Sequence, residues 1–98
     1  MTIDKKQNGT ELIIFLTGRL DTITAPQLEG ELKTSLNGIK ALTLDFSGLE
    51  YLSSAGLRVI LAAQKVMSKQ GKMVVRNVNQ VIMEVFEVTG FCDILTIE

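Results

Sequence analysis

The fold of this chain is decided by the stretch LDFSGLEYLSSAGL, which covers residues 44–57. Its apolar beginning predicts a buried strand, its middle a short polar loop, and the pair Ser53-Ser54 the start of a helix. A serine at a helix N-terminus meets backbone N–H groups that lack a partner in the helix, at the positive end of the helix dipole. A phosphate is favoured at such a place. We therefore expect a position where the surface charge can change while the core stays intact.

Turn signals and hydrophobic periodicity extend this pattern over the rest of the chain. Asn8-Gly9 predicts a hairpin, and the capping-box spacing of Thr24 and Gln27 marks a helix whose cap is Thr24 or Ala25. The expected strands cover residues 3–7, 11–17, 41–46, 72–76 and 94–97, and the expected helices cover about 24–37, 54–69 and 79–88. Strand–helix alternation requires parallel strands joined by right-handed crossovers, to which the hairpin adds an antiparallel strand. We predict one α/β domain over residues 1–98, with a small mixed sheet of four to five strands flanked by three helices.

The composition argues against several classes of protein. With 98 residues, of which 46% are hydrophobic and 21% charged, the chain suits one compact domain. A net charge of -1 argues against a nucleic-acid binder, and no window approaches the roughly 18 consecutive apolar residues of a membrane span. The first residues lack the apolar region of a signal peptide. We expect a cytoplasmic protein that contacts neither nucleic acid nor membrane directly.

The residue types that carry most enzyme chemistry are scarce. Histidine is absent and Cys92 is the only cysteine, which excludes an intrachain disulfide and the common zinc sites. The apolar neighbours of Cys92 favour a buried or half-buried side chain. Asp21 and Asp45 are each expected near the carboxyl end of a strand, where they could hold a metal ion or act as an acid/base pair, but bracing their own loops is the simpler role. We expect no enzymatic activity and no cofactor.

Helical periodicity also assigns side chains to the core. The inward faces of the second and third helices are expected to hold Leu57, Ile60, Leu61, Gln64, Met67, Val81, Ile82, Val85 and Phe86. Gly56, in the first turn of the second helix, indicates close approach by another element of the fold or by a partner. Leu49, Tyr51 and Leu52 precede this helix and either pack down onto the core or project to anchor a partner.

Ser53 and Ser54 allow two interpretations from spacing alone. Ser53 fits the N-cap position, which contributes about 1 kcal/mol, and capping is the simpler explanation of the pair. Ser54 then lies in the first turn with its hydroxyl free. Phosphorylation there would add roughly -1.5 to -2 charges, which suit the helix dipole but oppose an acidic or apolar partner. A phosphate on Ser54 is therefore expected to act on binding rather than on folding.

The central motif resembles the signature of STAS domains, most of all that of free-standing bacterial anti-sigma factor antagonists. The resemblance covers essentially the whole chain and includes Gly18-Arg19-Leu20-Asp21, Ala25-Pro26 and Val88-Thr89-Gly90-Phe91. It implies that the dephosphorylated protein binds an anti-sigma factor that is also a serine kinase, which frees a sigma factor. The kinase then phosphorylates the antagonist, and a serine phosphatase restores it.

The resemblance also implies which residues act. The family's phosphoserine stands two residues before a Gly-Leu pair, here Gly56-Leu57, which places it at Ser54. Well-known members carry Asp immediately before it, where this chain has Ser53, so phosphorylation is expected to be slow or to use a different kinase if that carboxylate assists. The expected partner surface comprises Asp21, Tyr51, Ser53, Ser54, Ala55, Gly56, Leu57 and Arg58.

Two further expectations concern assembly and output. The protein is expected to be a monomer when free. The alternative function is a STAS scaffold or sensor subunit that controls an output other than a sigma factor through protein–protein binding. The sequence shows no attached membrane or sensor segment, and this favours the free-standing switch.

Overall fold

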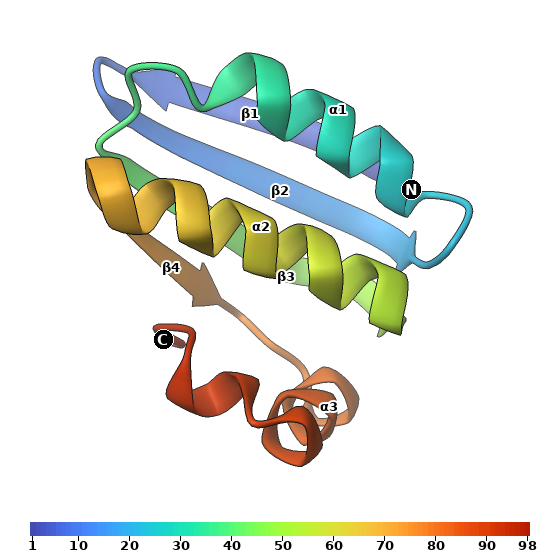
Figure 1. Ribbon diagram of the computed structural model, residues 1–98. Coiled ribbons are helices and arrows are strands. Elements are labelled where there is room, and N and C mark those ends of the chain that lie inside the picture. The colour runs from blue at the N-terminus through green and yellow to red at the C-terminus, as the bar shows by residue number, and fades with distance from the viewer.

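The computed structural model describes all residues, 1–98, and contains one mixed sheet with three α-helices (Figure 1). In chain order the elements are β1 (Thr2–Asn8), β2 (Glu11–Leu20), α1 (Ala25–Ser35), β3 (Ala41–Leu52), α2 (Ser54–Gln70), β4 (Lys72–Arg76), α3 (Gln80–Thr89) and the short 3-10 helix η1 (Phe91–Asp93). The strand order is β1-β2-β3-β4, with β1 antiparallel to β2 and the other neighbours parallel. The predicted α/β fold with a mixed sheet and three helices is confirmed.

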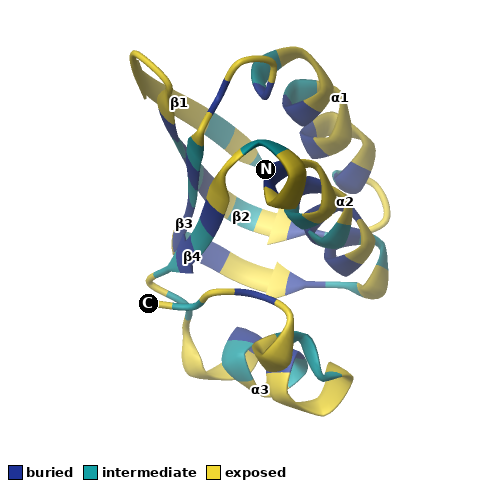
Figure 2. Ribbon diagram, turned by 60° about the vertical axis from the view of Figure 1, so that its left-hand side comes forward, coloured by how far each residue is buried: buried dark blue, intermediate teal, exposed yellow.

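The helices are distributed unevenly around the sheet. Figure 2 shows α1 and α2 side by side on one face, while α3 lies past the end of β4 and beside the C-terminal half of β3, where Asn79 Nδ2 donates to the Leu49 carbonyl. Alternate residues of the central strands, such as Ile14 and Leu44, are fully buried beneath α1 and α2. The buried apolar residues form a single cluster, so one core holds both helices to the sheet. None of the helices is long and apolar enough to cross a membrane.

The central strands are longer than the sequence pattern predicts. β2 continues to Leu20 and β3 to Leu52, so the expected loops at 18–22 and 47–52 are largely strand. The two extensions pair with each other, for instance Leu20 with Leu52, after register shifts that mark bulges. A side chain at Gly48 would lie 2.8 Å from Thr17 Oγ1, so glycine permits this close pairing. The sequence pattern did not reveal this part of β3, because its buried residues Leu49 and Leu52 are separated by two exposed residues instead of alternating with single ones.

The C-terminal segment differs most from expectation. The strand expected at 94–97 is a single parallel bridge between Val75 and Ile97. Gly90 adopts a left-handed conformation with φ 78°, and η1 follows directly, so the chain turns before it can extend. Leu95 takes the buried position, and Cys92 is exposed, which corrects the prediction of a buried or half-buried thiol.

Most of the side chains of α2 and α3 that were predicted to face the core do so, with three exceptions. In α2, Leu61 and Gln64 are only half-buried. Val59 and Ala63 are buried in their place, because α1 packs along that side of α2. In α3, Ile82 and Phe86 are buried as predicted, and the Phe86 ring lies 6.3 Å from that of Phe46. Val81 was expected to face the core and does not.

Candidate partner-binding surface

Ser53 joins the sheet to α2. Its backbone N–H donates to the Leu20 carbonyl at 2.9 Å, and its own carbonyl accepts from Leu57 N at 2.9 Å. Its side-chain hydroxyl accepts from Gly56 N at 3.3 Å, which caps the helix. The predicted capping role of Ser53 is confirmed, and all of its polar groups are occupied by the fold.

Ser54 is the first residue of α2 and is exposed. Its hydroxyl has no hydrogen-bond partner within the chain, and no acidic residue lies in the first helical turn. Because Ser53 already supplies the cap, a group attached to Ser54 would not remove a contact that the fold needs. The unpaired N–H groups and the dipole of a 17-residue helix favour negative charge at this end.

Gly56 and Leu57 support this turn from beneath. A side chain at Gly56 would lie 2.7 Å from Leu20 Cγ and 2.8 Å from Leu52 Cδ1, so glycine lets α2 pack directly on the ends of β2 and β3. Leu57 is buried in the same cluster. The sequence left open whether another part of the chain or a partner protein approaches Gly56 closely, and the structure shows that Leu20 and Leu52 of this chain do so. Both residues position the exposed turn rather than form its surface.

The loop between β2 and α1 is shaped by Asp21. Its Oδ1 accepts from Ile23 N at 3.0 Å and from Thr24 N at 3.1 Å. The Thr24 backbone hydrogen bond lowers the pKa of Asp21, with smaller contributions from Ile23 and Arg19, and together they outweigh the opposing effect of desolvation. Thr24 is the N-cap residue of α1, but its hydroxyl bonds Arg19 O and the Asp21 turn, so the capping box expected with Gln27 does not form.

This loop presents an apolar side chain that the sequence analysis did not select. Ile23 is 87% exposed, because the Asp21 turn holds its backbone and directs the side chain outward. The signal was its position in a polar stretch, DTIT, where no periodic partner exists to bury it. Exposed aliphatic side chains on ordered loops are suited to anchoring a protein partner.

Tyr51 and Arg19 form the neighbouring part of the surface. They pair across β2 and β3, and the Arg19 guanidinium lies 4.2 Å from the centre of the Tyr51 ring. Arg19 Nε also lies 3.6 Å from Asp21 Oδ2. Tyr51 is 39% exposed, whereas Leu49 and Leu52 are buried. The structure thus divides the two roles expected for these residues: the leucines pack down and the tyrosine projects.

Arg58 and Ala55 lie on the side of α2 that faces α1. They border an open groove of about 330 Å³ between the two helices, lined by Thr22, Ala25, Pro26, Glu29, Ala55, Arg58 and Val59. Arg58 is exposed, as predicted, and makes no ion pair within the chain. Its charge is therefore available to a partner.

Asp45 lies apart from this surface. It is only 3% exposed, and its Oδ2 accepts from Arg76 Nε at 2.8 Å and from Asn77 Nδ2 at 3.0 Å. Its Oδ1 accepts from Ser47 N at 2.9 Å. Burial alone would raise the pKa of Asp45, but these hydrogen bonds prevail and lower it to about 2. Asp45 and Asp21 each brace their own segment, and no group of three His, Cys, Asp or Glu residues could hold a metal ion.

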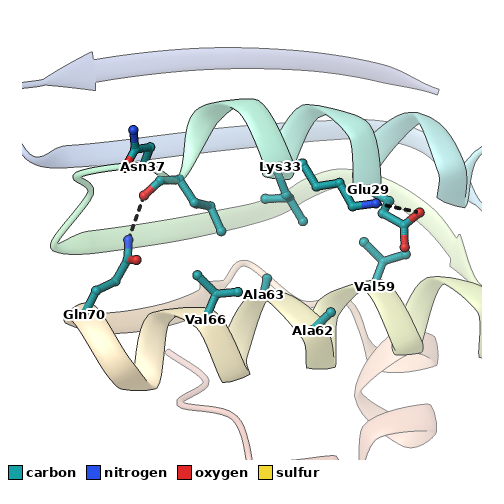
Figure 3. Close-up of a pocket in the computed structure, with 10 residues that line it drawn as sticks. Glu29, Lys33, Asn37, Val59, Ala62, Ala63, Val66 and Gln70 are labelled. Atoms are coloured by element: carbon teal, nitrogen blue, oxygen red, sulfur yellow. Dashed lines mark hydrogen bonds and ion pairs between the residues drawn. The ribbon is translucent and has the colours of Figure 1, made fainter.

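A larger groove runs between α1 and α2 farther from Ser54. It measures about 560 Å³ and is bordered by apolar side chains such as Val59 and Val66 (Figure 3). One of its ends is closed by Gln70, whose amide donates to the Leu36 and Ile39 carbonyls at 2.7 Å. It shares Glu29 and Val59 with the smaller groove, but none of the predicted partner-binding residues lines it.

Comparison with known proteins places this geometry in a family. Residues 3–96 match the family described as Mlab, STAS domain. The chain belongs to the STAS domain family. The Bordetella bronchiseptica protein BtrV, provisionally named an anti-sigma factor antagonist, is 37% identical over 99 residues, which cover 99% of this chain and 84% of BtrV. The resemblance stated from the sequence is thus confirmed.

Solved structures of STAS proteins show the same fold. The crystal structure of an anti-sigma factor antagonist from Mycobacterium paratuberculosis superposes with a TM-score of 0.89 at 23% identity, covering 98% of this chain and 83% of that one. The Bacillus cell fate determinant SpoIIAA, solved in its phosphorylated form, gives a TM-score of 0.77 at 17% identity, covering 99% of this chain and 91% of that one.

Proposed function

We propose that this protein is an anti-sigma factor antagonist whose binding is switched by phosphorylation of Ser54. The observation that carries the proposal is that the two serines at the start of α2 have different roles. Ser53 uses its hydroxyl to cap the helix, and Ser54 offers a free one at the surface. The names of its STAS relatives and the existence of a phosphorylated form of SpoIIAA support this function.

In the unphosphorylated state, the surface would bind an anti-sigma factor that is also a serine kinase, and so release a sigma factor. Tyr51, Ile23 and Arg58 supply an aromatic, an aliphatic and a cationic contact around Ser54. Aromatic and arginine side chains are the residue types that contribute most at such interfaces.

Phosphorylation would transfer the terminal phosphoryl group of a nucleoside triphosphate to Ser54 Oγ. An O–P bond forms at the serine, the bond to the nucleoside diphosphate breaks, and the hydroxyl proton passes to a base of the kinase. The helix N-terminus tolerates the new charge of roughly -1.5 to -2. The same charge repels an acidic partner, and it opposes the binding of an apolar partner because the phosphate would lose its hydration. A phosphatase would restore the serine hydroxyl by hydrolysis, in which water breaks the O–P bond and inorganic phosphate is released.

The intact mass of the protein from its native cells tests this proposal. We expect a species heavier by one phosphoryl group that disappears after phosphatase treatment and is absent from Ser54→Ala. Ser53→Ala is the matched control, because it removes the adjacent hydroxyl and leaves Ser54 in place. A single unmodified species under several growth conditions would contradict the switch.

Binding provides the second readout. The unphosphorylated protein is used to capture its kinase, and affinity is then compared for Ser54→Ala and Ser54→Asp. Ser54→Ala should bind normally and escape regulation, whereas Ser54→Asp should bind at least about tenfold more weakly, because a carboxylate reproduces part of the added charge. Undiminished binding of Ser54→Asp would count against the electrostatic mechanism.

A further inference from the structure

α3 carries apolar side chains on a side that no other part of the chain covers. Val81 is 60% exposed and Val88 is 87% exposed, with the half-buried Val85 between them. Their spacing of four and then three residues aligns them on one side of the helix, which we call the valine stripe (Val81, Val85 and Val88). Figure 2 shows α3 at the side of the sheet next to β3, with exposed residues on the side of the helix that is turned away from the sheet.

The valine stripe is not explained by the needs of the fold. Ile82 and Phe86 already anchor α3 to the core, and both are fully buried. Valine lowers helix stability relative to alanine or the long charged residues, because its branched side chain loses rotamers in a helix. The exposed Val81 and Val88 therefore weaken α3 without a packing gain inside the chain, whereas Val85 between them packs partly against the core. An aligned apolar stripe of this kind is typical of a surface that binds a partner.

The charges around the valine stripe define what can bind there. Glu84 and Glu87 are exposed on the same helix and take part in no ion pair. All ten Lys and Arg residues lie within residues 1–76, whereas residues 77–98 contain four acidic residues and no basic one. The C-terminal segment that carries the stripe, residues 77–98, thus has acidic charges only.

We propose that the valine stripe binds an amphipathic helix of a partner protein whose apolar side is bordered by Lys or Arg. The i, i+4, i+7 spacing fits helix-to-helix docking, and basic residues would pair with Glu84 and Glu87. A second copy of this chain would place the same glutamates against one another across a two-fold axis, and an anionic bilayer would repel them. The surface lies on α3 rather than on α2, so binding there does not depend on Ser54 or on the function proposed above.

Two synthetic peptides test this inference on the full chain. Both are amphipathic helices of 18 residues with leucine on one side; one carries lysine beside the leucines and the other glutamate. We expect the lysine peptide to shift the backbone amide resonances of residues 80–89 and to bind more weakly as salt is raised. The glutamate peptide should leave these resonances unchanged.

Variants of exposed residues show whether the stripe itself is responsible. Val81→Ser with Val88→Ser should keep the fold, because both side chains are exposed, and should weaken lysine-peptide binding about tenfold or more. Val66→Ser, an exposed valine on α2, is the matched control and should change nothing. Glu84→Lys with Glu87→Lys should reverse the preference between the two peptides.

Several results would overturn the inference. Equal binding of both peptides, no binding of either, or shifts confined to α2 would each reject a basic helical partner at the valine stripe. Self-association that Val81→Ser with Val88→Ser abolishes would assign the stripe to a second copy instead. Binding to phosphatidylcholine–phosphatidylglycerol vesicles through α3 would assign it to a membrane.

Discussion

The first turn of α2 and the polar cluster around Asp45 (Asp45, Ser47, Arg76 and Asn77, the Asp45 cluster) use polar groups in opposite ways. In the first turn, Ser53 completes the fold and leaves the Ser54 hydroxyl free at the surface. In the Asp45 cluster, both carboxylate oxygens accept hydrogen bonds beneath the surface. In the first arrangement the Ser54 hydroxyl can change without the loss of a hydrogen bond that the fold uses, whereas a change of Asp45 removes several such hydrogen bonds. Both arrangements involve β3, because Asp45 and Ser47 lie within this strand and Ser53 directly follows it.

The largest effect should come from breaking the Asp45 cluster. Asp45→Ala leaves the Ser47 N–H and the Arg76 and Asn77 side chains without their acceptor, so we expect the free energy of unfolding to fall by about 3 kcal/mol. Urea unfolding measures this loss. Asp4→Ala removes an exposed aspartate of β1 and should change stability by less than about 0.5 kcal/mol. Equal effects of the two substitutions would show that the cluster is not structural.

Acid should reveal the same cluster in the unmodified protein. The folded pKa of Asp45 is lowered to about 2 from an ordinary value of 3.8, so the folded state binds the proton less readily than the unfolded state. Its stabilising contribution is full above about pH 5 and is lost as the pH falls through 3.8 towards 2. Solvent around the partly exposed Arg76 reduces this contribution to about 1–2 kcal/mol. Urea unfolding from pH 7 to 2 should show the loss, and Asp45→Asn should flatten it; an unchanged slope in Asp45→Asn would assign the acid sensitivity to other carboxyl groups.

The cap at Ser53 should have a smaller effect, on stability alone. Ser53→Ala removes the side-chain acceptor of Gly56 N and should lower the free energy of unfolding by about 1 kcal/mol, again measured in urea. Ser53→Asp restores an acceptor and should recover that stability, because aspartate is an equally good N-cap. A loss of Ser54 phosphorylation in Ser53→Ala, with the fold intact, would mean that the two serines are not functionally separate.

The smallest effect belongs to the surface contact beside Ser54. Arg19→Gln removes the cation over the Tyr51 ring and its ion pair with the Asp21 carboxylate, and the Arg19 side chain is 58% exposed to solvent. We expect the free energy of unfolding, measured by thermal unfolding, to change by less than about 1 kcal/mol. Partner binding should weaken, because the Arg19 side chain no longer holds the Tyr51 ring in place. A strong loss of stability would place Arg19 with the Asp45 cluster rather than with the binding surface.

Local signals predicted the elements that have strong caps and clear periodicity. The start of α2 at Ser53-Ser54 and the buried pair Ile82 and Phe86 are found in the structure. The hairpin is found as well, although its two turn residues are Gly9 and Thr10, because Asn8 pairs with Glu11 as the last residue of β1. In each case the deciding interaction lies within a few residues along the chain. The overall order of strands and helices follows from such signals together with crossover rules.

The features that the sequence did not disclose depend on contacts between distant residues. β3 continues past Phe46 because Leu49 and Leu52 find partners in β2 across a bulge, which no local pattern records. Val81 is exposed because tertiary packing fixes the orientation of α3, whereas the exposure of Ile23 follows from the local Asp21 turn. The apolar setting of Cys92 misled in the same way, since Leu95 occupies the place in the core.

The short junction between β3 and α2 determines how the protein can respond to a modification of Ser54. A single residue, Ser53, separates Leu52 in the sheet from Ser54 in the helix, and it is bonded to both sides. Because this connection is only one residue long, a rotation or translation of α2 would break the hydrogen bonds that Ser53 makes with Leu20 and Leu57. A partner would then recognise a phosphoryl group on Ser54 through its charge and not through a movement of α2. The rate of switching would be set by the kinase and the phosphatase rather than by a conformational change of this protein.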